Sequence, residues 1–486
     1  MTQGGTLLPF STKLLYGFGS IAYGIKDNAF AYFLLFVYVQ IFGLAPELAG
    51  LAILVMLIFD AVSDPLIGYI SDNTRSRWGR RHPFMYGSII PVALTFFLIW
   101  DPPAGASDQT LFWYLLLIGI GIRTTITLYE IPSTALGPEL TQDYVERSSL
   151  IAFRAWFGWW GGLIMWNLLW LFVVYSSLSG TEDARYNPET WVVYGIACSI
   201  VMALAILVTG IGTHKHIPNL HIPERRPDDA QGNQVNQVKT VIKDIWLTLN
   251  VSRNYRILFI AYIVCKAASG LFTNLTLFYY SYYWELEAID ILTIGMTLFM
   301  APVLGLKLAP LCTQLFGKRN TAIGFFAASM VMENALILLR VLDLLPANES
   351  PLILAFVLIC HFAAVTSIIV AGTAVGSMVF DTVEEVETAT QKRMEGTLLA
   401  ARSFAEKCMA GVGAFSAGLI LSFAAWPEEA TPGLVAQVTL DNVGIYTVIA
   451  STCLWLLGLF FISKVKEDRA THAERLSDLT RSVEDT

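Results

Sequence analysis

Residues 46–84 read PELAGLAILVMLIFDAVSDPLIGYISDNTRSRWGRRHPF, an apolar segment followed by a basic turn. The apolar part, residues 46–70, is long enough to cross the ~30 Å hydrocarbon core of a bilayer as a helix. A single segment in lipid satisfies its backbone hydrogen bonds only as a helix. The turn carries four arginines, and loops rich in Arg and Lys stay on the cytoplasmic side. This stretch therefore predicts a transmembrane helix that ends in the cytoplasm.

The composition of the whole chain agrees with that of this segment. Of 486 residues, 55% are hydrophobic and only 14% are charged, whereas soluble domains carry about 25% charged residues. The aromatic share of 13% and the 36 glycines fit a helical bundle better than a barrel. The net charge of −8 is spread over loops, which argues against a nucleic-acid partner. The six cysteines are scattered, so neither a disulfide framework nor a zinc site is expected.

Twelve apolar segments of this kind occur along the chain, and we expect a transmembrane helix in each. Their approximate limits are 13–40, 46–70, 83–101, 111–136, 149–176, 190–213, 255–284, 288–315, 320–342, 350–380, 394–425 and 437–464. The sequence therefore predicts an all-α polytopic membrane protein with twelve transmembrane helices.

The predicted spans divide into two halves. Basic turns follow the second and the eighth span, six spans apart, which indicates a duplication of six plus six helices. Residues 214–254 are polar and rich in charge, as is typical of a linker. The predicted parts are an N-terminal bundle, a cytoplasmic linker, a C-terminal bundle and a cytoplasmic tail, over 1–213, 214–254, 255–466 and 467–486.

The loop charges predict the orientation. The loops on the side away from the basic turns contain acids and, with the exception of Arg185, no Lys or Arg. The positive-inside rule then places both termini in the cytoplasm. The first residues lack the basic region and cleavage site of a removable signal, so we expect the first helix to be retained. The expected location is the cell membrane, which is the inner membrane if the source is a bacterium.

Ionisable residues inside the spans are the candidates for function, because each costs roughly 2.5–3.5 kcal/mol at a helix centre. Asp60 and Asp64 are one helical turn apart and share a face. Two such carboxylates share a proton, meet a basic partner or bind a cation. With oxygens from Ser63 and Thr127 they would form a shell that suits Na⁺ or Li⁺. The competing interpretation is that Lys26 or Arg154 neutralises the pair.

The other charges of the first half leave alternatives open. Lys26 and Asp27 point about 100° apart around their helix, so we expect both to reach other helices. Arg123 and Glu130 are two turns apart on one face, where they either pair with each other or bind substrate. Near the end of its span, Arg154 is expected to extend toward the interface, as is Lys307 in the second half.

In the second half, Arg402 and Glu406 at i, i+4 are expected to neutralise each other. Lys407 points elsewhere and has no obvious partner, which makes it a candidate for function. For Glu333 and His361 we favour hydrogen bonds between helices over a role in function. The run FRAWFGWWGGLIMWNLLW at 153–170 contains tryptophans that either stack on a sugar or pack against helices and lipid.

Four segments together resemble the glycoside–pentoside–hexuronide:cation symporters, the melibiose-permease-like family of the major facilitator superfamily. They are YGFGSIAYGIKDNAF at 16–30, FDAVSDPLIGYISDNTRSRWGRRHPF at 59–84, EIPSTALGPELTQDYVERSSLIAFRAWFG at 130–158 and VFDTVEEVETATQKRMEGTLLAARSFAEK at 379–407. The resemblance spans nearly the whole chain. It implies the major facilitator fold of two six-helix bundles, which rock around a central site.

The resemblance also implies roles for individual residues. The family's cation-binding aspartates match Asp60 and Asp64, Ser63 replaces an Asn, and the helix-four Thr is kept as Thr127. The sugar-binding acids match Asp27 and Glu130, and the bases Lys26, Arg154 and Lys407 align as well.

Three further differences from the family bear on the substrate. Thr134 stands where the family has a sugar-stacking Trp, and Arg123 and Lys266 are additional positive charges. Seven bases then face six acids in the spans, which favours an anionic substrate such as a uronide or a sulfonated sugar.

The function predicted is cation-coupled symport of a sugar, glycoside or sugar acid by alternating access, in a monomer. The partners are this substrate, the lipid bilayer and a monovalent coupling cation, Na⁺, H⁺ or Li⁺, with no other cofactor. The alternatives are a cation-coupled carrier of lysophospholipids or other amphiphiles, and a non-transporting sensor on the same scaffold. An enzyme is not expected, because no nucleophile–base pair or phosphate-binding loop stands out.

The basic turn after the second span is a candidate cytoplasmic gate. Its arginines, Arg75, Arg77, Arg80 and Arg81, are expected to pair with acids at nearby helix ends, Asp143 or Glu146.

Overall fold

The computed structural model describes residues 8–141, 143–179, 183–220, 252–390, 395–428 and 430–465, with the backbone alone at residues 144, 219, 383–390 and 395–402. The helices are α1 (Phe10–Phe18), α2 (Ser20–Tyr32), α3 (Leu34–Gln40), α4 (Pro46–Asn73), α5 (His82–Leu98), α6 (Asp108–Leu140), α7 (Tyr144–Leu178), α8 (Pro188–His214), α10 (Arg253–Phe278), α11 (Ala288–Leu298), α12 (Ala301–Phe316), α13 (Lys318–Val341), α14 (Pro351–Thr390), α15 (Glu395–Phe423) and α16 (Gln437–Ser463). Short helical turns lie at Ala184–Tyr186 and Ile217–Asn219, and a π-helical turn continues α10 at Tyr279–Tyr283.

Each predicted span coincides with helix, so the all-α polytopic fold is confirmed for the described residues. Ten helical stretches are long and apolar enough to cross a membrane, and α5 is a shorter apolar helix. The first span is divided among α1, α2 and α3, because the helix is interrupted at Gly19 and Phe33. Gly19 is required there, since a Cβ atom would lie 1.7 Å from the Tyr129 hydroxyl of α6.

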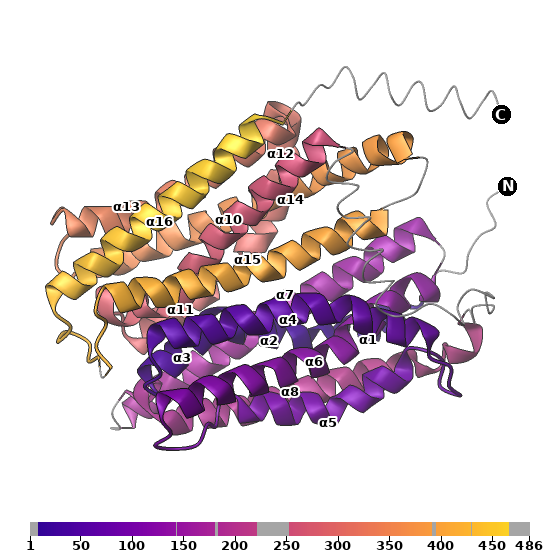
Figure 1. The fold of residues 1–486 in the computed structure, drawn as a ribbon, viewed down its shortest axis with the longest axis horizontal. Coiled ribbons are helices and arrows are strands. Elements are labelled where there is room, and N and C mark those ends of the chain that lie inside the picture. The colour runs from indigo at the N-terminus through magenta and orange to yellow at the C-terminus, as the bar shows by residue number, and fades with distance from the viewer. Residues whose placement is uncertain are drawn as a thin grey trace.

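The helices form two bundles that lie side by side (Figure 1). Helices α1–α8, drawn in indigo to magenta, make the first bundle, and α10–α16, in red to yellow, make the second. Helices α4 and α15 pack along each other where the bundles meet, and α7 packs on α11. Residues 221–251, most of the predicted linker, and 466–486, with the predicted tail, lie outside the described residues. The predicted domain limits therefore remain predictions.

Inside the first bundle, glycines bring α2 and α7 into backbone contact. A Cβ atom on Gly24 would lie 1.9 Å from the carbonyl oxygen of Gly158, and one on Gly162 would lie 2.6 Å from that of Gly24. Small residues permit such close approach between membrane helices. The contact holds Asp27 of α2 and Trp159 of α7, each within three residues of these glycines, at the same wall between the bundles.

At the end away from the basic turns, the two bundles touch. The rings of Phe36 and Phe278 lie edge to face with centroids 5.2 Å apart. The indole Nε1 of Trp426 donates a hydrogen bond of 2.7 Å to the Gln40 side chain. Both contacts join a helix or loop of one bundle to one of the other, so this end is closed.

Candidate cation and substrate site

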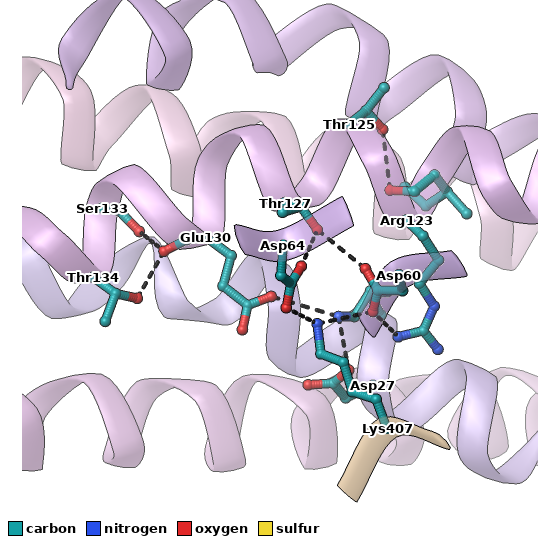
Figure 2. Close-up of polar contacts among 12 residues, drawn as sticks. Asp27, Asp60, Asp64, Arg123, Thr125, Thr127, Glu130, Ser133, Thr134 and Lys407 are labelled. Carbon is teal, nitrogen blue, oxygen red and sulfur yellow. Dashed lines mark hydrogen bonds and ion pairs between the residues drawn. The ribbon is translucent and has the colours of Figure 1, made fainter. Parts of the chain in front are cut away.

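The predicted acidic pair lies in the interior of the protein, where α4 meets α6 and α15. The Asp60 side chain is 1% exposed and that of Asp64 is 15% exposed. The Thr127 hydroxyl of α6 lies 3.1 Å from Oδ1 of both carboxylates (Figure 2). The second and fourth spans therefore touch, as a cation shell that includes Thr127 requires, and one hydroxyl connects both acids.

Two basic groups reach these carboxylates from other helices. Lys407 of α15 places its ammonium 2.9 Å from Asp60 Oδ2 and 2.5 Å from Asp64 Oδ2 (Figure 2). Arg123 of α6 lies 3.3 Å from Asp60 Oδ2 and, on its other side, over the Phe30 ring. The Lys407 contact joins the first bundle to the second, because α4 and α15 belong to different bundles.

These contacts supply partners that the sequence did not indicate. Lys407 had no obvious partner, and Lys26 or Arg154 was the alternative source of neutralising charge, but Lys407 and Arg123 bond the acidic pair. Of the two alternatives for Arg123 and Glu130, the pair between them does not form, since Glu130 meets Lys26. Spacing along one helix shows which residues share a face, but it does not show which helix packs against that face.

The predicted neutral ligand Ser63 is placed differently. Its hydroxyl donates a 3.1 Å hydrogen bond to the carbonyl oxygen of Asp60 in the same helix. Of the two predicted neutral oxygens, Thr127 is therefore the one that contacts the carboxylates. Ser63 would have to rotate to join a cation site.

A second group of charged residues, on α2 and α6, comprises Lys26, Asp27 and Glu130. The Lys26 ammonium, 2% exposed, is 2.9 Å from Asp27 Oδ1 and 3.6 Å from Glu130 Oε2 of α6. Asp27 was expected to reach another helix, but the contact it makes is with its neighbour Lys26. Its side chain is 57% exposed and lines a cavity between the bundles. The carboxylate of Asp27 is therefore available to a ligand.

Arg154 is buried instead of extending toward the interface. It donates hydrogen bonds to the hydroxyls of Ser133, at 3.2 Å, and Thr134, at 2.7 Å. Its guanidinium also lies 5.3 and 5.4 Å from the ring centres of Tyr16 and Tyr23. Within the described part of the chain it forms no ion pair. Thr134, which stands where the family has an aromatic ring, thus holds Arg154.

In the second bundle, Lys266 and Glu406 form a 2.7 Å ion pair, and the Tyr262 hydroxyl donates to Glu406. The side chain of Arg402 is outside the described residues, so its pairing with Glu406 stays a prediction. The expected inter-helix bond of Glu333 is confirmed by Trp455 Nε1, 3.2 Å away. For His361 the described contact is with the Tyr280 ring, edge to face.

The basic turn bonds acids other than those predicted. Arg80 and Arg81 both contact Glu139 at the end of α6, at 2.8 and 3.0 Å, and Arg81 also pairs with Asp72. Glu146 bonds Lys13 instead. All these partners belong to the first bundle, so the contacts of Arg80 and Arg81 fix the turn within that bundle and do not bridge the two.

Two adjoining cavities lie between the bundles. One has a volume of about 600 Å³ and is lined by Asp27, Trp159 and Trp166 on one side and by Lys266 and Tyr280 on the other. The second, of about 890 Å³, shares Trp159, Lys266 and Tyr280 with the first. It extends to Ile151, near the start of α7, and to Gly376 on α14, toward the basic turns. The space between the bundles thus reaches from Asp27 toward the basic end.

The cavity lining includes residues that the sequence did not single out. Trp159 faces both cavities, whereas Trp156 of the same run stacks on Trp160. The π-helical turn at Tyr279–Tyr283 contributes Tyr280, and π-helical turns are often found at functional sites. The Trp-rich run signalled an aromatic surface, but which rings face the cavity depends on how α7 packs.

The family model described as MFS/sugar transport protein matches residues 15–466. An uncharacterized symporter of Synechocystis is 41% identical over 205 residues, 41% of this chain and 36% of that protein. The uncharacterized symporter YnaJ of Bacillus subtilis is 26% identical over 96% of this chain and 94% of its own length. The isoprimeverose transporter of Lactiplantibacillus pentosus is 23% identical over 94% and 89%.

A shorter match, 30% identical over 30% of this chain and 28% of the relative, is to the sodium-dependent lysophosphatidylcholine symporter 1 of Gallus gallus. Among solved structures, a bacterial homologue of ferroportin in an inward-facing state has a TM-score of 0.62 at 13% identity, covering 93% and 98% of the chains. The inward-open xylose transporter XylE of E. coli has a TM-score of 0.56 at 16% identity, covering 97% and 99%.

These structures share the fold of this chain, and the family model covers all twelve of its predicted spans apart from the first two residues of the first. The protein is a multi-pass membrane protein that belongs to the MFS/sugar transport protein family.

Proposed function

We propose that this protein is a secondary active transporter that couples the uptake of a glycoside or sugar acid to a monovalent cation, in the cell membrane and with both termini in the cytoplasm. The observation that carries the proposal is the contact of Lys407, from one bundle, with both Asp60 and Asp64 of the other. Full-length relatives named as symporters, and one named for isoprimeverose transport, support it.

The coupling step follows from competition for the two carboxylates. In the present arrangement Arg123 and Lys407 neutralise Asp60 and Asp64. The coupling cation therefore has to displace the Lys407 ammonium. Oxygens of Asp60, Asp64 and Thr127 then hold the cation, and Na⁺ or Li⁺ suits such ligands. Release of Lys407 loosens a contact between bundles. Cation binding and bundle movement are thereby linked, and each ligand alters the affinity for the other.

The accessibility of the cavities fits alternating access. The positive-inside rule makes the end with the basic turns cytoplasmic. The opposite end is closed by contacts such as Phe36–Phe278, while the larger cavity extends toward the basic end. This arrangement corresponds to a transporter with its outer entrance shut. Rocking of the bundles would open that entrance and close the inner one.

The charges of the site favour a substrate that carries a negative charge. Four bases (Lys26, Arg123, Arg154, Lys407) lie with four acids (Asp27, Asp60, Asp64, Glu130), so the group is balanced before a coupling cation enters. Binding of the cation adds one positive charge in a region of low dielectric. A carboxylate or sulfonate on the sugar restores the balance.

The test is sugar uptake into proteoliposomes, with isoprimeverose, lactose, methyl β-D-glucoside and methyl β-D-glucuronide as probes, with and without a Na⁺ gradient. Asp60→Cys is expected to abolish stimulation by Na⁺, Li⁺ or a proton gradient. Asp108→Cys, at an exposed position at the start of α6, is the control and should retain it. Cation stimulation that persists in Asp60→Cys would contradict the assigned cation site.

The same proteoliposomes distinguish the amphiphile carrier. The cavity places charged Asp27 and Lys266 opposite each other, which suits a hydroxylated ligand better than an acyl chain. Lysophosphatidylcholine is therefore expected to compete less well than the sugars. If it alone competes, the protein is a lipid carrier, and if none of the probes exchanges in counterflow, the proposal of sugar transport is wrong.

A further inference from the structure

The aromatic surface of the cavity lies on α7 and not on α6. Thr134 of α6 has no ring, and its hydroxyl is engaged with Arg154 at 2.7 Å. Trp159 lines both cavities and is 41% exposed. In the described part of the chain no other ring stacks on its indole, whereas Trp156 and Trp160 stack on each other. The faces of Trp159 are therefore free of other rings.

The carboxylate of Asp27 lines the same wall of the smaller cavity as the Trp159 ring. Asp27 is 57% exposed and lines the smaller cavity together with Trp159. The Gly24–Gly158 contact fixes the two helices that carry these residues, since a Cβ atom on Gly24 would lie 1.9 Å from the Gly158 carbonyl oxygen and separate them. An aromatic face packs against the C–H groups of a sugar ring, while a carboxylate accepts hydrogen bonds from its hydroxyls.

Unsatisfied polar groups occur around the same cavity. Among the residues that the structure describes, Tyr280 OH, Trp166 Nε1 and Asn28 Oδ1 have no hydrogen-bond partner. All three residues line the smaller cavity, and Tyr280 and Trp166 are each 4% exposed. A buried polar group without a partner is costly. These atoms are shielded from solvent in this conformation, so a ligand would reach them only after the bundles move.

We infer that Trp159 is the platform on which the sugar ring of the substrate stacks, beside Asp27, and that Tyr280 of the second bundle completes this subsite when the bundles close. The inference rests on the proposed sugar transport. The inference predicts that the substrate contains a pyranose ring with C–H groups along one face. It also explains how the site operates with Thr134 in place of an aromatic residue.

The first step of the test identifies a ligand for the wild-type protein. Calorimetry in nanodiscs measures the binding of four sugars at roughly 100 mM Na⁺, which is near the physiological salt level. The sugars are isoprimeverose, lactose, methyl β-D-glucoside and methyl β-D-glucuronide. If none of them binds and none is transported, sugar transport itself is refuted, together with this subsite. If one binds, the variants are compared with that sugar.

The second step compares variants of the ring. Trp159→Ala should weaken binding by about tenfold, Trp159→Phe should restore part of the loss, and Trp159→Leu should not, because it lacks an aromatic face. Trp156→Ala, which removes an exposed ring outside the cavities, is the matched control and should bind as the wild type does. A melting profile and elution volume like those of the wild type show that each variant is folded.

Two results would overturn the inference while leaving sugar transport intact. One is wild-type affinity in folded Trp159→Ala. The other is equal recovery by Phe and Leu, which would mean that the side chain packs but does not stack. Tyr280→Phe removes one hydroxyl from the opposite wall and should weaken binding severalfold without changing the response to Na⁺. Unchanged affinity in Tyr280→Phe would remove Tyr280 from the subsite.

Discussion

Lys407 Nζ on α15 lies 2.5 Å from Asp64 Oδ2 on α4, so an ion pair of the candidate site connects the two bundles. The same ammonium is 2.9 Å from Asp60 Oδ2. In the proposed cycle the two bundles separate and approach, so this contact would respond both to the coupling cation and to the movement. An ion bound between these carboxylates would therefore change the conformational equilibrium in the proposed cycle.

Replacing Lys407 by Gln should separate cation binding from transport. The variant leaves Asp60 and Asp64 with Arg123 as their basic partner, so the group gains a net negative charge. We expect Na⁺ to bind more tightly than in the wild type, because no ammonium competes for the carboxylates. Sugar uptake driven by Na⁺ should fall by at least about tenfold, because the ammonium whose displacement links cation binding to bundle movement in the proposed cycle is missing.

The measurement is stabilisation by Na⁺ in thermal unfolding, together with uptake into proteoliposomes. Lys318→Gln is the control, because Lys318 pairs with Asp381 at 2.7 Å inside the second bundle. It should retain the Na⁺ response of the wild type. Weaker Na⁺ binding in Lys407→Gln would mean that the ammonium supports the cation site and does not compete for it.

The position of the helices could be predicted from the sequence, because span length and hydropathy depend on local composition. The charged candidates could be named because few ionisable residues lie inside the spans. Their partners could not be derived. Lys407 and Asp64 are 343 residues apart, and only packing of α15 on α4 brings them together.

Hydrogen bonds within one helix compete with contacts between helices, and the sequence does not show which of the two a side chain makes. Ser63 was predicted as a cation ligand, but its hydroxyl bonds the carbonyl oxygen of Asp60 within its own helix. Such bonds compete with contacts to other groups, and residue type alone does not show which one forms. In the Trp-rich run at 153–170, the sequence likewise did not show which rings face a cavity and which pack against other helices. Trp159 and Trp160 are neighbours, yet Trp159 lines the cavities and Trp160 packs on Phe299.

The backbone contact between α2 and α7 predicts a large effect of a single methyl group. Gly24→Ala would place its Cβ atom 1.9 Å from the carbonyl oxygen of Gly158, so the helices must separate. Overpacking of this kind costs about 1–3 kcal/mol. We expect a lower melting temperature in detergent and weaker sugar binding, because Asp27 and Trp159 move apart.

Gly87→Ala on α5 provides the comparison, since nothing lies within 4 Å of the added atom. There the higher helix propensity of Ala, worth about 1 kcal/mol, should leave the melting temperature unchanged or raise it. Equal melting temperatures for the two variants would show that α2 and α7 are not in close contact.

The charge of the substrate can be tested by competition. The balanced site gains a positive charge when the cation binds, so methyl β-D-glucuronide should compete with uptake at about tenfold lower concentration than methyl β-D-glucoside. Na⁺ should strengthen the competition by the uronide more than that by the neutral glucoside. Better competition by the glucoside would indicate a neutral substrate and a charge balance completed in another way.

Arg185, the exception to the loop-charge pattern, predicts how the outer entrance is held shut. It lies in the short helical turn between α7 and α8 and is 4% exposed. Its guanidinium donates to Ser281 Oγ and to the Leu286 carbonyl oxygen of the second bundle, both at 3.1 Å, and pairs with Asp183 at 2.6 Å. Arg185→Gln removes bonds between the bundles, each worth about 1.5–3 kcal/mol.

The expected result is a shift toward the outward-open state. In a cysteine-free background, Thr273→Cys in the cavity should react severalfold faster with an impermeant maleimide added outside when Arg185 is Gln. Arg340→Gln is the control, because Arg340 bonds Pro346 and Asn348 within the second bundle. Unchanged labelling in a folded Arg185→Gln variant would mean that aromatic contacts such as Phe36–Phe278 close the entrance without the arginine.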